Sequence, residues 1–406
     1  MRGDTPYIHA PEVDGSGFAP LSTPVHHAST VTFSSVEAFE ERHERLYDGY
    51  SYGLYGTPTT RSLEQQVAAL EGGKRALVTP SGLSAIGLVC MAFAQGGDKI
   101  LMPSCLYGPA RAMAARLLGP LGVETVVYEP LIGPEIAQLI DERTRLVWVE
   151  SPGSVTFEVQ DVPAIIAAAH PRGTLVAADN TWATPLLFNA LAHGVDVSMQ
   201  SLSKYASGHS DLNMGSVAVR EERLFRRLKD VSRLLGLGVS GEDCFLCQRG
   251  LQTLPLRLRQ SERTALSLLD WLAGQDVVAR ALHPSRPDHP GHGTWARDFS
   301  GSAGVFSIVL HDEVGRPALE RAVRELRVFK LGASWGGAHS LLAPSDPRPG
   351  RSDLTWLPSG QVVRVSIGLE EAADLIEDLD RFLKVLRLHA STNASVPARR
   401  LSAVRG

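Results

Sequence analysis

Short runs of β-branched and other apolar residues alternate with helical patterns from about Lys74 onward. This alternation is typical of successive βαβ units, in which each helix returns the chain for another parallel strand. The expected strands are Ala76–Thr79, Lys99–Met102, Glu124–Tyr128, Arg145–Glu150, Leu175–Ala178, Val197–Ser201 and Ser216–Val219. The helices expected between them include Leu83–Phe93, Pro134–Ile140 and Val162–His170. The pattern therefore predicts an α/β domain with a mostly parallel, doubly wound sheet.

The rest of the chain divides around this domain. Residues 1–60 are rich in Pro, Gly, Ser, Thr and Tyr without long periodic segments, and we interpret them as an N-terminal arm that clasps another subunit. Residues 61–256 form the large domain, residues 257–389 a smaller α+β domain, and residues 390–406 a flexible tail. The smaller domain is expected to contain helices Gln260–Leu272, Ala318–Leu326 and Glu371–Leu386 and strands Val305–Leu310 and Val362–Ile367.

Composition narrows the class of partner. Forty Lys and Arg residues against 44 Asp and Glu residues give a net charge of −4, and no half of the chain is strongly basic, so we expect no nucleic-acid partner. Four scattered cysteines do not suggest a disulfide framework, and no apolar signal core lies near the start. The uncharged stretch from Ala76 to Gln95 contains Pro80, Gly82 and several hydroxyl residues, so we predict a strand, a turn and a buried helix there and no membrane span. We expect a cytoplasmic protein with a small-molecule partner.

Polar residues follow several of the predicted strands. In open α/β sheets, ligands bind beyond the carboxyl ends of the strands. The residues expected there are Ser81–Leu83, Tyr107, Glu150–Pro152, Asp179–Trp182 and Ser201–Lys204. Backbone N–H groups of Gly82 and Leu83 at a helix start suit a phosphate, although Ser-Gly before a helix is also a common turn.

Lys204, Asp179 and Tyr107 suggest a carbonyl cofactor. A desolvated lysine has a lowered pKa and can form a Schiff base, although most lysines are simply solvated. Asp179 is able to cap a helix, but it is equally suited to pair with a pyridinium nitrogen. Tyr107 is either a packed surface aromatic or a residue that stacks on such a ring.

Other polar clusters favour structural roles. The spacing of Cys244 and Cys247 is that of metal ligands, but no second pair lies near, and on a helix it places two small apolar groups on one face. We therefore expect no metal. His209 and Asp211 follow Lys204 closely, and we assign them to turn formation and packing. Three further histidines lie among Pro and Gly and indicate a loop: His283, His289 and His292.

Several ordered motifs between Tyr52 and Leu386 resemble one enzyme family, the Cys/Met-metabolism family of pyridoxal-phosphate enzymes. Within it the motifs are most similar to the bacterial type of cystathionine β-lyase. The matching segments are Tyr-Gly-x-x-Gly-Thr at 52–57, Leu-Glu-Gly-Gly at 70–73, Glu-Ser-Pro-Gly-Ser at 150–154, Asp-Asn-Thr-Trp at 179–182, Ser-Lys-Tyr-x-x-Gly-His-Ser-Asp at 203–211, Ser-Trp-Gly-Gly at 334–337 and Arg-Val-Ser-Ile-Gly-Leu-Glu at 364–370.

The resemblance implies the fold type I of pyridoxal-phosphate enzymes, a homotetramer built from dimers, and a role for each matched residue. Lys204 is implied to be the Schiff-base lysine and proton shuttle, Asp179 the pyridinium partner, and Tyr107 the stacking residue that assists proton transfer. The implied phosphate ligands are Ser201, Ser203, the backbone amides of Gly82 and Leu83, and Tyr52 from the neighbouring subunit. The implied substrate ligands are Arg364, which suits an α-carboxylate, with Ser334 and Trp335.

Two positions depart from the family pattern. Leu54 stands where the family has an arginine that binds phosphate, and we hypothesise that Arg61 replaces that cation. Ala333 stands where bacterial β-lyases have tyrosine and γ-enzymes have glutamate, so this position does not decide the reaction. Trp335 and the segment 152–154 favour a carbon–sulfur β-lyase that acts on cystathionine or a related cysteine conjugate. The alternatives are a γ-lyase or γ-replacement enzyme of the same family, and a binding protein that has lost turnover.

Overall fold

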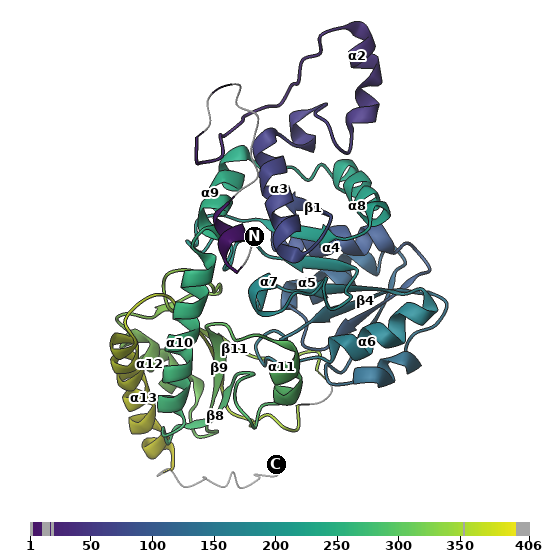
Figure 1. Ribbon diagram of the computed structural model, residues 1–406. Coiled ribbons are helices and arrows are strands. Elements are labelled where there is room, and N and C mark those ends of the chain that lie inside the picture. Colours follow the sequence, from purple (N-terminus) through teal and green to yellow (C-terminus); the bar gives the residue numbers. More distant parts are fainter. Residues whose placement is uncertain (1–2, 10–16, 18–19, 352–353, 395–406) are drawn as a thin grey trace, which may run out of the picture.

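The computed structural model describes residues 3–9, 17, 20–351 and 354–394 and contains two lobes (Figure 1). The larger lobe is built on a seven-stranded sheet of order β1-β7-β6-β5-β4-β2-β3. Its strands are β1 (Arg75–Thr79), β2 (Lys99–Pro103), β3 (Glu124–Tyr128), β4 (Thr144–Glu150), β5 (Leu175–Asp179), β6 (Val197–Gln200) and β7 (Gly215–Val219). Strands β2 to β6 are parallel, and β7 runs antiparallel to β1 and β6. The predicted α/β class is confirmed, and each predicted strand lies within one residue of the observed one at both ends.

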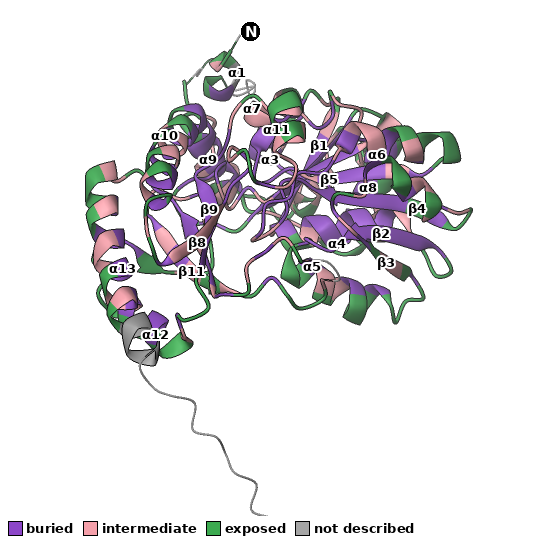
Figure 2. Ribbon diagram, turned by 90° about the horizontal axis from the view of Figure 1, so that it is seen from below, coloured by how far each residue is buried: buried purple, intermediate pink, exposed green. Residues whose placement is uncertain are grey.

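Side chains of the sheet alternate between two apolar layers, as the period of two in a strand requires. On one face Val147 and Val149 pack with α3 (Pro58–Glu71), α6 (Val162–Ala169) and α9 (Gly241–Leu251). On the other face Leu146 and Trp148 pack with α4, α5 and α8, whose bounds are Gly82–Phe93, Gly108–Met113 and Glu222–Leu234. Figure 2 shows the strands of this sheet coloured mostly as buried, so the strand ends are where polar side chains are available to a ligand.

One expected helix is wrong in type. The sequence pattern predicts an α-helix over Pro134–Ile140, but the structure has a 3₁₀ helix there, η4 (Gly133–Gln138). Only a short link joins β3 to β4 here, and the tighter turns of a 3₁₀ helix are sufficient to bury Ile136 and Ile140.

The smaller lobe contains a five-stranded sheet of order β10-β11-β12-β9-β8. Its strands are β8 (Val278–Leu282), β9 (Val305–Leu310), β10 (Lys330–Leu331), β11 (Leu341–Ser345) and β12 (Val362–Ser366). An apolar cluster joins this sheet to α10 (Leu254–Leu272), α12 (Arg316–Arg324) and α13 (Ala372–Ala394), and the short helix α11 (His292–Asp298) lies nearer the large lobe. Strands β8, β10 and β11 were not predicted, because they are short, half exposed or interrupted by Pro344.

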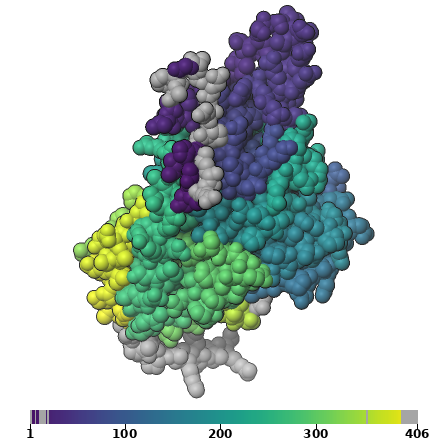
Figure 3. Space-filling view, viewed as in Figure 1, coloured from purple at the N-terminus to yellow at the C-terminus, as the bar shows by residue number. Residues whose placement is uncertain are grey.

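The N-terminal and C-terminal regions of the chain do not contribute strands to either sheet among the described residues. The N-terminal region holds α1 (Thr5–Ile8), α2 (Val36–Glu40), η1 (Glu41–Arg45) and η2 (Gly53–Tyr55). Tyr7 of α1 is buried in the core, whereas α2 stands away from the body (Figures 1 and 3). The remaining element, α7 (Thr184–Leu187), and the 3₁₀ and π turns η5 (His170–Arg172) and η3 (Ala114–Leu118) belong to the large lobe. Helix α13 continues to Ala394, and residues 395–406 of the expected tail lie outside the described residues.

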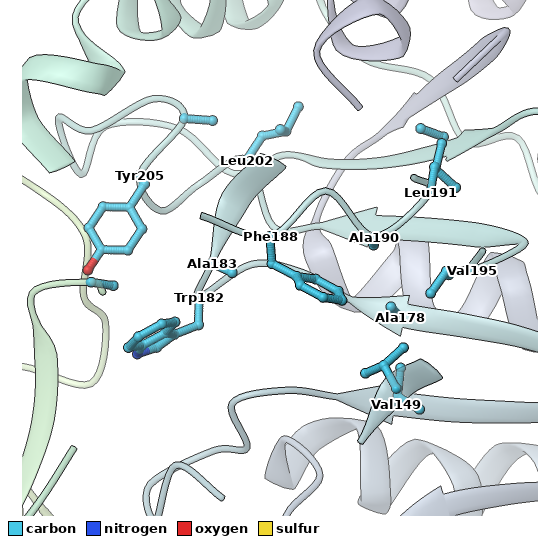
Figure 4. Close-up of a cluster of buried hydrophobic side chains, with 14 of the residues drawn as sticks. Val149, Ala178, Trp182, Ala183, Phe188, Ala190, Leu191, Val195, Leu202 and Tyr205 are labelled. Atoms are coloured by element: carbon cyan, nitrogen blue, oxygen red, sulfur yellow. The ribbon is translucent and has the colours of Figure 1, made fainter. Parts of the chain in front are cut away.

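Contacts between the lobes are specific. Trp182 donates from Nε1 to the carbonyl O of Val305 (3.3 Å), and the hydroxyl of Tyr205 accepts from the N–H of Gly304 (3.0 Å). Figure 4 shows Trp182 and Tyr205 at the end of a buried apolar cluster that also contains Val149 and Phe188. Among the described residues, we find no helix with the length and apolar character needed to cross a bilayer.

Candidate active site

A cleft with an empty volume of about 940 Å³, open to solvent at its mouth, lies between the two lobes. The large lobe lines it with residues at the strand ends, and the small lobe adds Val305, Trp335 and Arg364. Of the predicted residues, the cleft brings together Gly82, Leu83, Tyr107, Asp179, Ser201, Ser203, Lys204, Trp335 and Arg364.

One end of the cleft is the start of α4. Ser81 caps this helix: its hydroxyl accepts from the N–H of Ser84 (3.0 Å), and its own N–H donates to the Ser84 hydroxyl (2.9 Å). The N–H groups of Gly82 and Leu83 belong to the first turn, where no helical carbonyl is available to them. A Cβ on Gly82 would lie 2.7 Å from Cβ of Ser201, so glycine lets the end of β6 approach the helix start closely. This arrangement suits a phosphate.

The hydroxyl residues near this end are already ordered by the backbone. The N–H of Ser201 donates to Oγ1 of Thr181 (2.8 Å), a cleft residue that was not singled out from the sequence. Oγ of Ser203 accepts from the N–H of Met214 (2.9 Å) and donates to its carbonyl (3.1 Å). Ser203 therefore closes the loop after β6, and its hydroxyl proton must leave the Met214 carbonyl before it is free for an anion.

Lys204 follows the end of β6 and reaches across the cleft. Its Nζ donates to Oγ of Ser334 (2.7 Å) and lies 5.7 Å from the ring centre of Trp335. Burial, and then the positive charge of Arg364, lower the pKa of Lys204, while Asp179 opposes them. A lowered pKa favours the neutral amine that attacks a carbonyl.

Asp179 is the last residue of β5, and its Oδ1 accepts from the N–H of Thr181 (3.0 Å). Burial raises the pKa of Asp179 against the lowering effect of the Thr181 hydrogen bonds and of Lys204. A carboxyl at this depth is suited to one hydrogen-bond donor of a bound ring rather than to solvent.

Tyr107 precedes α5, and its N–H donates to Oε2 of Glu150 (2.8 Å). Burial, Asp179 and Glu150 raise the pKa of the Tyr107 phenol, and Arg364 opposes them. Tyr107 is 43% exposed, so an open face of its ring is available to a ligand in the cleft.

Arg364 lies in the middle of β12, with the carbonyls of Ala333 (2.7 Å) and Ser334 (3.2 Å) accepting from its Nη2. Burial lowers the pKa of Arg364, and Tyr107 opposes this. Trp335 packs edge-on against Tyr205 with 5.4 Å between ring centres. Ser334 and its neighbour Ala333 are both exposed.

The structure does not bring Tyr52 into the cleft of its own chain. Tyr52 is 42% exposed, and its hydroxyl accepts from Oγ of Ser29 (3.4 Å). Leu54 packs against Gly238. The hypothesis that Arg61 replaces the missing cation finds no support, because its guanidinium is buried, donates to Glu64 (2.9 Å) and Tyr55 (3.3 Å), and lines a different cavity.

The residues assigned to packing lie outside the cleft. Cys244 and Cys247 are fully buried on α9, and burial raises the pKa of the Cys244 thiol to about 12. His209 hydrogen-bonds the carbonyl of Ser207 (2.6 Å), as a turn residue does. His283 and His289 lie in the expected loop, where burial lowers the pKa of both, and His292 begins α11.

Comparison with known proteins agrees with this geometry. The family model described as Cys/Met metabolism PLP-dependent enzyme matches residues 4–384. A protein of Rhizobium johnstonii that is provisionally named a cystathionine β-lyase is 43% identical over 91% of this chain and 92% of its own length. The cystathionine β-lyase MetC of Escherichia coli is 38% identical over 93% of this chain and 97% of its own length. The solved cystathionine γ-synthase of Xanthomonas oryzae pv. oryzae superposes with a TM-score of 0.87 at 30% identity, covering 95% of this chain and 98% of the other.

The fold and the cleft define an enzyme of the fold type I class that uses pyridoxal 5'-phosphate. Within that class, the chain belongs to the Cys/Met-metabolism family of PLP-dependent enzymes. The residues present fit the cofactor: the start of α4 offers N–H groups of the first helical turn at a glycine that approaches Ser201, and a partly buried amine and a partly buried carboxyl stand in the same cleft.

Proposed function

We propose that the protein is a carbon–sulfur β-lyase that converts cystathionine to homocysteine, pyruvate and ammonia, or cleaves a related cysteine S-conjugate. The observation that carries this proposal is the convergence of Lys204, Asp179 and Arg364 on one cleft. This convergence supplies the amine, the ring partner and the carboxylate ligand that β-elimination from an amino acid requires. The cystathionine β-lyases among the relatives support the same reaction.

Each residue has a stated task in this proposal. Bound pyridoxal phosphate supplies an electron sink next to the substrate α-carbon. Gly82, Leu83, Ser201 and Ser203 would hold the phosphate, and Asp179 would keep the ring nitrogen protonated. Tyr107 would cover the ring.

Lys204 performs the proton chemistry. It would hold the cofactor through its amine, and its Nζ would be the base that takes the α-proton of the substrate. Ser334 accepts a hydrogen bond from this nitrogen (2.7 Å) and so orients it. Arg364 would exchange its carbonyl partners at Ala333 and Ser334 for the substrate carboxylate, a stronger, charge-assisted ligand.

We further propose a cytoplasmic homo-oligomer in which Tyr52 reaches the phosphate site of a neighbouring subunit. The exposure of Tyr52, together with its position outside the cleft lining of its own chain, supports this arrangement. Analytical ultracentrifugation tests it, because a monomer with full activity would exclude a shared site.

The deciding experiment identifies the keto acid. Purified protein loaded with pyridoxal phosphate is incubated with cystathionine, and the products are separated by mass spectrometry. Pyruvate with homocysteine is the expected result. Release of 2-oxobutyrate with cysteine would assign the γ-reaction, which needs a second base at the β-carbon that Ala333 does not provide. A yellow protein that releases neither would point to a different amino-acid substrate.

A further inference from the structure

Glu150 is a buried carboxyl in the cleft for which the proposed reaction has no task. It ends β4 and pairs in register with Asp179 at the end of β5. Its exposed fraction is 6%, and it lines the cleft. A buried carboxyl is costly unless its oxygens have hydrogen-bond partners, so its contacts indicate its purpose.

Both oxygens of Glu150 bind groups on loops at the cleft. Oε2 accepts from the N–H of Tyr107 (2.8 Å), and Oε1 accepts from Oγ of Ser154 (2.6 Å). A third hydrogen bond joins the same two loops, from the N–H of Ser154 to the carbonyl of Cys105 (2.9 Å). Glu150 therefore connects the turn after β2 to the turn after β4.

The Tyr107 backbone is the group whose position matters for the reaction. Its N–H lies at the start of α5, where no helical acceptor is available, and Glu150 satisfies it. The exposed ring of Tyr107 is carried by this backbone, so a shift of the turn moves the ring relative to Asp179 and Lys204. Misplacement by about 1 Å in an active site is able to cost about 10²-fold in rate.

We propose that Glu150 is a positioning residue, which holds the backbone of Tyr107 and the hydroxyl of Ser154 so that the Tyr107 ring covers the bound pyridoxal ring. This inference rests on the proposed use of Tyr107 as the stacking residue. Burial and the charge of Asp179 raise the pKa of Glu150 to about 8, whereas the hydrogen bonds from Ser154 and Tyr107 lower it.

The experiment compares Glu150→Gln and Glu150→Ala with the wild-type holoenzyme. Glutamine keeps one acceptor oxygen, and alanine keeps none. Glu142→Gln is the matched control, because Glu142 is exposed just before the same strand. The measurements are visible circular dichroism of the bound cofactor, which reports the asymmetry of its surroundings, the cofactor dissociation constant, and kcat and KM per bound cofactor.

We expect Glu150→Ala to lower kcat about 10²-fold, with KM within about threefold of wild type, and to reduce the visible dichroism. Glu150→Gln should fall between this variant and wild type, and Glu142→Gln should match wild type. Wild-type dichroism and kcat in both Glu150 variants would overturn the proposal, as would a lower melting temperature as the sole change. If Glu150→Ala does not fold, Glu150→Gln decides by the same readouts.

A double-mutant cycle isolates the route through Tyr107. Tyr107→Leu keeps the backbone N–H but removes the ring. If Glu150 acts through this ring, Glu150→Gln should change the dichroism by less than half as much in the Tyr107→Leu background as in wild type. Equal changes in the two backgrounds would contradict the proposal. Because dichroism needs no substrate, a wild-type enzyme that releases no pyruvate would refute the β-lyase assignment alone, and the role of Glu150 would still be decided.

Discussion

The two sheets contribute to the cleft in different ways. The seven-stranded sheet supplies Asp179 and Glu150 at adjacent strand ends and places Lys204 just beyond a third, so its topology alone brings these groups together. The five-stranded sheet supplies Arg364 from the middle of β12, beside Ser307 on β9. The residues proposed to bind the cofactor are thus gathered by the strand order of the large lobe, whereas Arg364, the proposed substrate ligand, comes from a strand of the small lobe.

The arginine reaches the cleft only because the lobes are fixed to each other. Ser307, its neighbour across the sheet, donates from Oγ to the carbonyl of Val155 (2.8 Å), which lies on the loop that lines the cleft. Val155 has a φ of 69°, an unusual value for a β-branched residue, so this contact stabilises a strained turn. The comparison predicts that changes in the large lobe alter the cofactor, whereas changes in the small lobe alter substrate affinity or stability.

The largest effect is expected from Lys204→Ala. This variant lacks the amine proposed to take the α-proton, and we expect kcat to fall by at least about 10³-fold. The visible spectrum of the cofactor should change as well, because its covalent link is lost. Stopped assays of keto acid, with the melting temperature as a check on folding, test this. Activity within tenfold of wild type would show that another base serves the reaction.

Arg364→Ala should act mainly on substrate binding. The loss of a bidentate, charge-assisted contact to a carboxylate corresponds to roughly 10- to 100-fold, and we expect this in KM. The cofactor should still bind, with a smaller change in its visible spectrum because the charge of Arg364 lowers the pKa of Lys204. Arg364→Lys, which keeps the charge without the planar fork, should recover part of the loss. A change in cofactor binding with an unaltered KM would break the division between the two lobes.

The same division explains what the sequence could predict. The strands of the seven-stranded sheet were found because each is a short, largely apolar run bounded by turn residues, and the site followed because ligands bind at the carboxyl ends of parallel strands. Glu150 and Thr181 were expected at those ends but were given no role in the site. Their tasks depend on contacts with Tyr107 and Ser201, which sequence spacing does not reveal.

In the small lobe, fewer strands could be predicted from the sequence, and the reason is physical. Strand β8 is half exposed and β10 has two residues, so neither shows the alternation that marks a strand. Arg364 was identified through the family motif, since one arginine in a strand carries no signal of its own. The role expected for Tyr52 stays a prediction, because it depends on a second subunit.

Gly82→Ala should lower the affinity for the cofactor, although it removes no charged group. The new Cβ would lie 2.7 Å from Cβ of Ser201, which forces the helix start and the end of β6 apart. We expect the cofactor dissociation constant to rise about tenfold, equivalent to about 1.4 kcal/mol. Equilibrium dialysis measures it. Gly87→Ala on the same helix is the control, because its Cβ meets only the flexible side chains of Met113 and Met91. Equal weakening in both variants would place the effect in the helix rather than at the phosphate.

The smallest effect concerns a buried carboxyl of the small lobe that lies outside the cleft. Asp378 of α13 is fully buried, and its carboxylate accepts from the N–H groups of Arg327, Val328 and Phe329 (2.8 Å each) and from Arg381 (2.8 Å). Burial alone would raise its pKa, but these donors outweigh burial and hold the pKa of Asp378 below its usual value. The carboxylate thus ties α13 to the turn that leads into β10.

Asp378→Asn should therefore lower stability and leave catalysis unchanged. An amide presents one acceptor and one unwanted donor to these N–H groups, and we expect a loss of about 1–3 kcal/mol at pH 7. Because the folded-state pKa lies below the unfolded value of about 4, the carboxylate stabilises the fold above that pH and loses this effect as the pH falls through the folded pKa. Denaturant unfolding is measured at pH 7 and at pH 4 or below. The difference in unfolding free energy between wild type and variant should become smaller at the lower pH. The exposed Asp374→Asn on the same helix is the control. If this difference in unfolding free energy does not change with pH, the destabilisation comes from the poorer hydrogen bonding of the amide and not from the lost charge.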